Sequence, residues 1–178
     1  MKITDKYVFF WKEDPFCNFT RCKITTFDNG LDDETVFTSS EQLFMWYKAI
    51  FFNDEETAEK ILKSTRPEEA RKLGRLVKNY NDAEWNKVRV WYMHRVVLQK
   101  FTQNEDLRKK LCDLKYDGKQ FVEAAYYDRI WGIGYNENDA LVTPESKWGR
   151  NELGKILNEV RKLFMLKSAG VYKDIVEG

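Results

Sequence analysis

Two long segments carry apolar residues at the spacing of an amphipathic helix, and they constrain the fold more than any other feature. In residues 82–101 the repeat consists of Trp85, Val88, Tyr92 and Val96, widened by Met93, Val97 and Phe101. In the second segment it consists of Leu153, Ile156, Leu157, Val160, Leu163 and Phe164. Apolar residues at i, i+3, i+4 and i+7 share one face of a helix, so both segments need a core to pack against. We expect the first to be the longest helix and the second to be the last helix.

Short runs of β-branched and aromatic residues predict strands, because such side chains suit a pleated, half-buried surface. Residues 6–11, 22–27 and 35–37, with a turn at Asp28-Asn29-Gly30, predict a small N-terminal sheet. Residues 120–124 predict a buried strand, followed by a long loop through Lys147.

Residues typical of helix starts, namely Ser, Thr, Asp, Asn and Pro, divide the middle of the chain into several predicted helices. Four helices are expected there: from Thr38 or Ser39 to about Phe52, from residues 53–56 to about Lys63, from Pro67 to Leu73 or beyond, and over residues 104–111. Strands and helices do not alternate in βαβ units. The predicted fold class is therefore α+β, helix-dominated, a single domain with a small β-sheet, and a doubly wound nucleotide-binding fold is not expected.

The composition excludes several classes of protein. The 178 residues contain no apolar run of about 18 that could cross a membrane, and the polar start does not resemble a secretory signal. Thirty lysines and arginines against 29 aspartates and glutamates give a net charge of +1, which excludes a strongly basic nucleic-acid-binding shell. Cys17, Cys22 and Cys112 are too few for a disulfide framework, so free thiols are expected. We expect a soluble, cytoplasmic protein that does not bind membranes.

The helix after Ser39 carries an acid and an amine on one face. Glu41 and Lys48 are seven residues apart, within about 20° of each other at 100° per residue, with Phe44 and Met45 between them. A lysine buried beside apolar groups has a lowered pKa, and its amine becomes a usable nucleophile. The alternative is two solvated ends of an amphipathic helix.

Residues 121–135 have the pattern of a loop that leaves a rigid strand and carries a site. Glu123 interrupts the apolar strand, Asp128 follows it, and the turn contains Trp131, Gly132 and Gly134. Glycines let a ligand approach the backbone, and a tryptophan offers a stacking face. The alternative is an ordinary turn in which Asp128 caps its own backbone and Trp131 lies in the core.

Trp148, Gly149, Arg150 and Asn151 come directly before the last helix. The free N–H groups and positive dipole end of a helix start attract anions, so this segment is a candidate phosphate site. The alternative is a plain N-cap by Asn151. Arg75, after Gly74, is either a further phosphate-binding residue or part of a solvated helix face.

Two common catalytic devices are not indicated. The cysteines and the single histidine, His94, do not have the spacing of a zinc site, and no metal is expected. His94 fits a packed or solvated residue of the long helix better than a general base. No serine is marked as a nucleophile.

Taken together, these segments resemble the NADAR family, also called the YbiA-like family, in the right order over about residues 7–165. The segments that carry the resemblance are Phe16-Cys17-Asn18-Phe19, Ser40-Glu41-Gln42, Tyr47-Lys48-Ala49, Leu73-Gly74-Arg75, Trp85 through Met93, Lys100-Phe101, Val122-Glu123-Ala124, Asp128 through Gly134, Trp148 through Asn151, and Leu153-Gly154.

The resemblance implies an N-glycosidase with a mostly helical α+β fold that needs no metal or cofactor. Family members hydrolyse the N-glycosidic bond of early riboflavin-pathway intermediates or remove ADP-ribose from guanine bases in DNA. It implies a catalytic domain over residues 1–166 and a tail over 167–178. The residues that fall on the family's pocket positions are Asn18, Glu41, Lys48, Glu123, Asp128, Trp131 and Asn151.

These residues suit cleavage of a ribosyl C–N bond. Positive charge builds at the anomeric carbon, where a carboxylate such as Glu41 or Asp128 can stabilise it while the departing nitrogen is protonated. Lys48 is a candidate to capture the opened ribose aldehyde as a Schiff base. The expected substrate is ADP-ribosylated guanine in nucleic acid, with ADP-ribose as product. The alternatives are an N-glycosidase that acts on riboflavin-biosynthesis intermediates and a non-catalytic ADP-ribose or NAD-binding module.

Overall fold

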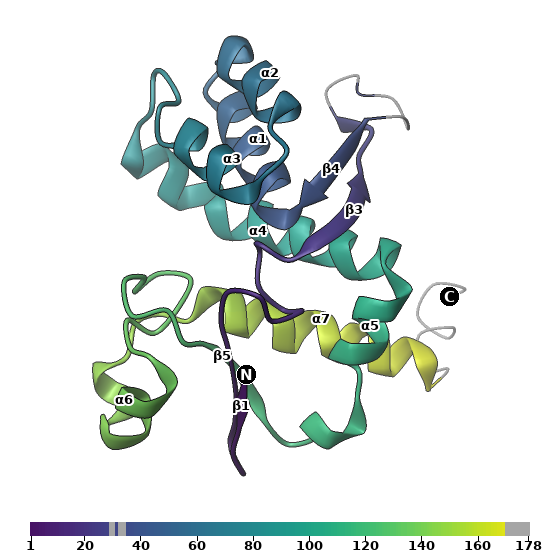
Figure 1. The fold of residues 1–178 in the computed structure, drawn as a ribbon, viewed down its shortest axis with the longest axis vertical. Coiled ribbons are helices and arrows are strands. Elements are labelled where there is room, and N and C mark those ends of the chain that lie inside the picture. The colour runs from purple at the N-terminus through teal and green to yellow at the C-terminus, as the bar shows by residue number, and fades with distance from the viewer. Residues whose placement is uncertain (29–30, 32–34, 170–178) are drawn as a thin grey trace. The chain divides into compact units, whose positions relative to one another are not determined.

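The computed structural model describes residues 1–28, 31 and 35–169, and they form two compact units. Unit 1 combines residues 1–17 with the described chain from Asp106 onward, and unit 2 consists of residues 18–105. Unit 1 is thus built from both ends of the chain, and Figure 1 shows it with the purple N-terminal strands and the yellow helix α7.

Unit 1 contains a three-stranded sheet of order β1-β2-β5, formed by β1 (Lys2–Ile3), β2 (Tyr7–Phe10) and β5 (Gln120–Glu123). β1 and β2 are antiparallel, whereas β2 and β5 are parallel, with Tyr7 opposite Gln120 and Phe10 opposite Glu123. The helices linked to this unit are α5 (Glu105–Leu111), α6 (Glu137–Val142) and α7 (Glu152–Ser168), with short 3-10 turns at Leu114–Tyr116 and Glu145–Lys147.

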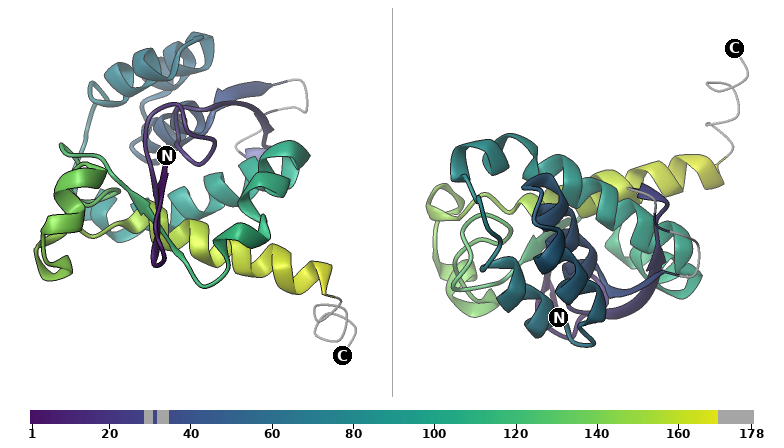
Figure 2. Two further views of the ribbon diagram at one scale, coloured as in Figure 1. Left: turned by 60° about the horizontal axis from the view of Figure 1, so that its bottom comes forward. Right: turned by 90° about the horizontal axis from the view of Figure 1, so that it is seen from above.

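Helix α7 packs directly on β5 (Figure 2). Its apolar stripe is buried from Leu153 to Val160 and only partly buried at Leu163 and Phe164. Phe16 fills the other part of the core with edge-to-face contacts to Phe10 and Phe121. Gly154 makes the close approach possible, because a Cβ there would lie 2.2 Å from the carbonyl oxygen of Phe121.

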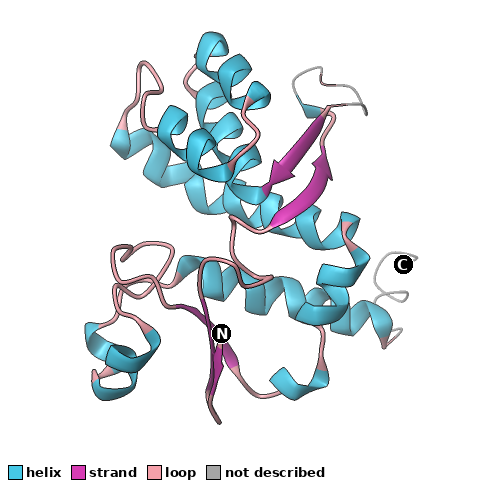
Figure 3. Cartoon of the chain, viewed as in Figure 1, coloured by secondary structure: helices cyan, strands magenta, loops and turns pink. Residues whose placement is uncertain are grey.

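Unit 2 contains the antiparallel hairpin of β3 (Arg21–Thr25) and β4 (Val36–Ser39), followed by α1 (Ser40–Phe51), α2 (Glu55–Lys63), α3 (Pro67–Gly74) and α4 (Asp82–Gln103). Helix α1 packs against α2, α3 and α4, and Figure 3 shows these cyan helices with the magenta hairpin beside them. Side chains cap three helix starts: Ser39 accepts from Gln42 N–H (3.2 Å), Asp54 from Thr57 N–H (3.1 Å), and Asn81 from Glu84 N–H (3.0 Å).

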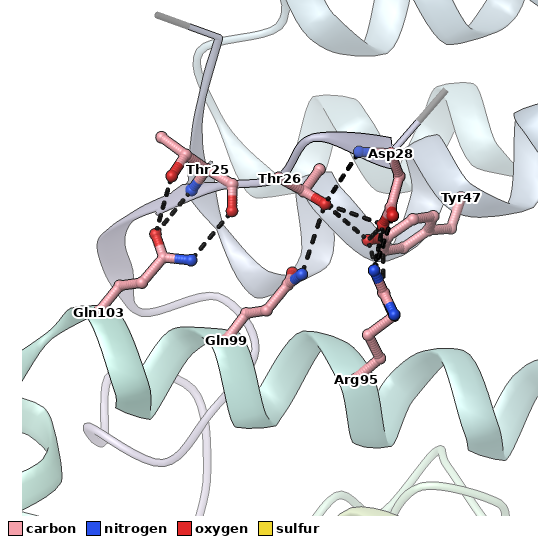
Figure 4. A network of polar contacts seen from close by, with 7 residues as sticks. All are labelled: Thr25, Thr26, Asp28, Tyr47, Arg95, Gln99 and Gln103. Carbon is pink, nitrogen blue, oxygen red and sulfur yellow. Dashed lines mark hydrogen bonds and ion pairs between the residues drawn. The ribbon is translucent and has the colours of Figure 1, made fainter. Parts of the chain in front are cut away.

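A polar network joins the end of β3 to α1 and α4 (Figure 4). Three side chains of α4, spaced four residues apart, point at this strand end: Arg95, Gln99 and Gln103. Arg95 binds both oxygens of Asp28 (2.6 and 2.8 Å), and the Tyr47 hydroxyl donates to the same carboxylate. Burial acts to raise the pKa of Asp28, but hydrogen bonds from Tyr47, Thr26 and Arg95 outweigh it and lower that pKa. The network therefore fixes α4 against the hairpin.

The structure confirms the helix-dominated α+β fold and corrects two details. A single N-terminal sheet was predicted, but β2 pairs in parallel with the distant β5 while β3 and β4 form a separate hairpin. The predicted long loop after β5 contains α6 and a 3-10 turn. Asn29 and Gly30 of the predicted turn lie outside the described residues. Within the described chain, no helix is long and apolar enough to span a membrane.

We predict that Gly154→Ala destabilises the protein. In an open helix this change would stabilise by up to about 1 kcal/mol. Here the added methyl group would collide with the backbone of β5, so we expect a loss of about 1–3 kcal/mol, measured by urea unfolding. Ser168→Ala, at the end of the same helix, is the control and should change stability much less. An increase in stability for Gly154→Ala would contradict the tight packing of α7 on β5.

Candidate active site

The predicted site residues fall into two groups, one in each unit. Unit 2 holds Asn18, Glu41, Lys48 and Arg75. Unit 1 holds Glu123, Asp128, Trp131, Gly132, Gly134, Trp148, Gly149, Arg150 and Asn151.

Glu41 and Asn18 meet at the start of α1. Glu41 lies in the first turn with only 7% of its surface exposed, and its backbone N–H donates to the carbonyl of Asn18 (3.0 Å). The side-chain amide of Asn18, 6% exposed, donates to the sulfur of Met93 (3.3 Å) on α4. Its Oδ1 is buried and accepts no hydrogen bond from the described residues. A buried acceptor without a donor is costly, so Asn18 is suited to accept a hydrogen bond from a ligand.

Lys48 lies two turns further along the same face of α1. Its Nζ donates to the carbonyl of Gly74 (2.8 Å) and lies 4.1 Å from the centre of the Tyr80 ring. Burial lowers the pKa of Lys48 and the nearby Arg75 lowers it further, against an opposing effect of Asp82. This confirms the expected lowered pKa. A larger share of the amine is therefore neutral, and nucleophilic, at a given pH than in an exposed lysine.

The face of α1 that carries Glu41 and Lys48 packs against α4. Phe44, between them, contacts the Trp85 ring at 5.4 Å between centroids. Asn18 bridges the Glu41 end to Met93, and Asp82 interacts electrostatically with Lys48 at the other end. Glu41 is buried and Lys48 is partly buried, which argues against the alternative of two solvated helix ends.

In unit 1, Asp128 shapes the loop that follows β5. Its Oδ1 accepts hydrogen bonds from the N–H groups of Ile130 (2.8 Å) and Trp131 (2.9 Å). This is the self-capping turn that was considered as the plainer alternative. Because the other carboxylate oxygen accepts no hydrogen bond from the described residues, the turn leaves Asp128 with one oxygen available for chemistry.

The glycines of this region pack against protein and do not leave room for a ligand. A Cβ on Gly132 would lie 2.8 Å from the carbonyl oxygen of Glu123, and one on Gly149 would lie 2.6 Å from the Cα of Arg129. Gly134 has φ +74° and the Arg129 side chain lies beside it. The expectation that Gly132, Gly134 and Gly149 allow close approach of a ligand is therefore corrected: the chain crosses itself at these points.

The start of α7 is also different from the predicted phosphate site. The backbone N–H groups of residues 149–153 all donate to carbonyls of residues 129–133. The five pairs are Gly149 with Ile133 (2.7 Å), Arg150 with Arg129 (2.8 Å), Asn151 with Gly132 (3.2 Å), Glu152 with Ile130 (3.0 Å) and Leu153 with Trp131 (3.1 Å). These donors hold the loop and are not free for an anion, which corrects that prediction.

Asn151 is likewise not a side-chain cap. Its backbone has φ 52°, and its amide lies against β5, where Nδ2 donates to the carbonyl of Phe121 (2.9 Å) and Oδ1 accepts from the N–H of Glu123 (3.0 Å). Glu123 is thereby held at the end of β5, half-buried, with its Oε2 atom enclosed by protein. Asn151 positions this carboxylate through the backbone that carries it.

The two tryptophans have different surroundings. Trp148 packs on Tyr7 and Phe9, at 5.3 and 6.0 Å between ring centroids, and belongs to an apolar cluster, which corrects its inclusion in the candidate phosphate site. Trp131 is only partly buried and lies outside the buried core, so it remains a candidate for stacking on a ligand ring. Arg75 and Arg150 are exposed and make no hydrogen bond or ion pair with a described side chain.

Comparisons with known proteins identify the family of the chain. The model of the NADAR domain family matches residues 9–165. The chain belongs to the NADAR family.

Relatives of this NADAR protein have been named for their activity. It is 35% identical to N-glycosidase R617 of Acanthamoeba polyphaga mimivirus over 89% of this chain and 96% of that protein. It is 30% identical to riboflavin biosynthesis protein VVA0006 of Vibrio vulnificus over 90% of this chain but only 39% of that protein. The solved NMR structure of the E. coli protein YbiA is similar, with a TM-score of 0.71, 25% identity and coverage of 94% of this chain and 90% of that one.

One buried charged residue of the NADAR protein, Arg89, was not predicted from the sequence. Arg89 lies on α4 four residues after Trp85 and four before Met93, and only 9% of its surface is exposed. A charged residue at a position of the apolar stripe was the available signal. Among the described residues, no group of three or more His, Cys, Asp or Glu side chains could hold a metal ion.

We predict that Asn151→Asp weakens the fold by removing one of its two bonds to β5. The change keeps an acceptor for Glu123 N–H but sets a carboxylate oxygen against the carbonyl of Phe121, so we expect a loss of about 1–3 kcal/mol in urea unfolding. Asn138→Asp is the matched control, because the exposed side chain of Asn138 accepts a bond from Lys2 through its oxygen, which the aspartate keeps. Equal stability of both variants would show that the amide does not hold β5.

Proposed function

We propose that this N-glycosidase removes ADP-ribose from guanine bases of DNA by hydrolysing the ribosyl C–N bond. The observation that carries the proposal is the pairing, on one face of α1, of the buried carboxylate of Glu41 with Lys48, whose pKa is lowered. A binding module for ADP-ribose would have no need of a nucleophilic amine. The family match and the relatives named as N-glycosidases support the reaction class.

Glu41 and Lys48 have complementary roles in the proposed reaction. As the bond to the base weakens, positive charge develops at C1′ of the ribose, and the carboxylate of Glu41 stabilises it. The base nitrogen takes the bonding electron pair and a proton.

Lys48 provides a covalent route. After the ribose ring opens, the neutral amine adds to C1′, the C–N bond to the base breaks, and the protonated base departs, which leaves a lysine imine. Water then adds to the imine carbon and Lys48 leaves as the amine, so the sugar is released as an aldehyde that closes to ribose. The hydrogen bond to Gly74 and the Tyr80 ring orient the amine before it reacts.

Two further residues support binding. Asn18 Oδ1 is a buried acceptor for a ribose hydroxyl, and the half-exposed Trp131 offers a face for a base or a ribose. The second candidate function is cleavage of riboflavin-pathway intermediates, favoured by the name of the Vibrio vulnificus relative. Both substrates carry a ribosyl C–N bond, so the same residues serve either reaction.

The substrate assignment is tested by chromatography. We expect the enzyme to release ADP-ribose from an oligonucleotide that carries ADP-ribosylated guanine, faster than it cleaves riboflavin precursors, with a rate that falls as salt screens the phosphate contacts of the DNA. Glu41→Gln should lower kcat by about 100-fold or more, because it removes the charge that stabilises the cation. Glu59→Gln, on the exposed face of α2, is the control and should have no effect. Faster turnover of the riboflavin precursors would favour the second function, and no turnover of either would reject both.

Trapping tests the covalent step. Borohydride added during turnover should link ribose to the wild-type protein at Lys48, and Lys48→Arg and Lys48→Ala should form no adduct. Lys63→Ala, an exposed lysine of α2, should leave trapping unchanged. Because imine formation needs the neutral amine and the pKa of Lys48 is lowered, the rate should rise with pH at values below the ordinary lysine pKa of about 10.4, and Lys48→Ala should abolish this rise. Unchanged activity in Lys48→Ala would remove Lys48 from the mechanism.

A further inference from the structure

Two tyrosines occupy the tip of the turn that follows β5. The N–H of Asp128 donates to the carbonyl of Ala125 (3.2 Å), which places Tyr126 and Tyr127 at the two corner positions between them. These tyrosines are 62% and 52% exposed. The corners of turns usually carry Gly, Pro, Asn, Asp or Ser, each for a backbone reason that an aromatic ring does not share. Neither the turn nor burial in the core therefore accounts for two aromatic rings at this place.

A third ring extends this surface from the neighbouring strand. The parallel strands β2 and β5 end side by side, since the N–H of Ala124 donates to the carbonyl of Phe10 (3.0 Å). Trp11 follows Phe10 directly, and its ring meets that of Tyr126 edge to face, at 6.1 Å between centroids and 72° between planes. Tyr126 meets Tyr127 in the same manner, at 5.2 Å and 87°. The three rings form one aromatic surface at the carboxyl ends of the two strands.

A lysine supplies positive charge beside the aromatic surface. The Nζ atom of Lys12 lies 4.5 Å from the centre of the Trp11 ring, and Lys12 forms no ion pair with a described residue. Asp14 does not cancel this charge, because its carboxylate is paired with the N-terminal amine (3.1 Å) and accepts from the N–H of Trp11 (2.9 Å). Glu13 is exposed and opposes an anionic partner. The net charge beside the rings is therefore small, and stacking is the main attraction that this surface offers.

The aromatic surface fits single-stranded nucleic acid better than another protein. Bases of any sequence stack on exposed aromatic rings, and lysines contact the phosphates between the bases. A stable protein–protein interface needs about 800 Å² on each partner. Three aromatic side chains of about 150–250 Å² each, partly buried here, supply less than that area by themselves.

We propose that Trp11, Tyr126 and Tyr127 form a stacking surface for the bases of single-stranded DNA that flank the modified guanine, with Lys12 contacting a phosphate. The inference rests on the proposed function, because it concerns the DNA part of the same substrate. The turn that carries the tyrosines leads directly into Asp128 of the candidate site. Because the bases of duplex DNA are already stacked on one another, an enzyme with this surface prefers single-stranded DNA.

Binding of unmodified DNA tests the surface without requiring turnover. We expect the wild type to bind a labelled single-stranded oligonucleotide of about ten nucleotides, measured by fluorescence anisotropy. The double variant Tyr126→Ala/Tyr127→Ala should bind at least about 10-fold more weakly, because it removes two stacking faces. Tyr126→Phe/Tyr127→Phe keeps both rings and should retain the wild-type affinity. Phe27→Ala removes a 73% exposed ring of unit 2 and is the control, also with wild-type affinity.

Two further measurements separate stacking from other effects. Both tyrosines are more than half exposed, so the alanine double variant should keep the wild-type Tm, and its weaker binding then does not come from unfolding. Lys12→Gln should lower the slope of log affinity against log salt by about 0.7, which corresponds to one phosphate contact on a single strand. No binding of the oligonucleotide by the wild type, or equal binding by the alanine double variant, would overturn the proposal.

The two proposals can fail separately. The alanine double variant should raise the KM for an ADP-ribosylated oligonucleotide more than the KM for ADP-ribosylated deoxyguanosine. DNA binding that depends on the rings, without cleavage of any ribosylated guanine by the wild type, would reject the proposed function and keep the stacking surface. Cleavage of the oligonucleotide with the same KM by the wild type and the alanine double variant would reject the stacking surface and keep the function.

Discussion

Both units depend on the same constraint: the backbone N–H and C=O groups on the edges of their short strands need hydrogen-bond partners. Helices supply them. On the free edge of β5, Asn151 binds Phe121 and Glu123, and Asn158 accepts from the N–H of Phe121. On the free edge of β3, Gln103 binds the N–H and C=O of Thr25, and Asn104 those of Lys23. Side-chain amides thus take the place of a neighbouring strand, and each helix is fixed at the position where its amide meets the strand.

This constraint also positions the chemistry. Because Asn151 anchors the start of α7, the N–H groups that follow Trp148 are turned to the carbonyls of the loop after β5, and that loop carries Asp128 and Trp131. Because Gln103 and Arg95 anchor α4 to β3, the opposite part of α4 presents Arg89 and Met93 beside α1. The amide and guanidinium contacts lie on the strand edges, whereas the unsatisfied Oδ1 of Asn18 lies in a residue that contacts Met93 of α4.

Local sequence patterns accounted for most elements and for the acid and amine of α1. The caps at Ser39 and Asp54 and the stripe of α7 are local features, because periodicity and capping depend on residues a few positions apart. The parallel pairing of β2 with β5 was not predicted, because the local sequence of a strand does not show which strand more than a hundred residues away it will pair with. The burial of Arg89 was missed for a related reason. An arginine is normally expected on the surface, and its burial depends on the residues that surround it in the folded protein.

The sequence alone determined the helix-rich class, the family resemblance, and the placement of Glu41 and Lys48 on one helix face, since each follows from residue order and helical period. Only the tertiary structure decided which polar groups are satisfied. It showed that the donors at the start of α7 are used by residues 129–133, that Trp148 belongs to an apolar cluster, and that Asn18 Oδ1 accepts no hydrogen bond from the described residues. A hydrogen bond is a contact in space, and the chain brings its partners from positions that local sequence cannot specify.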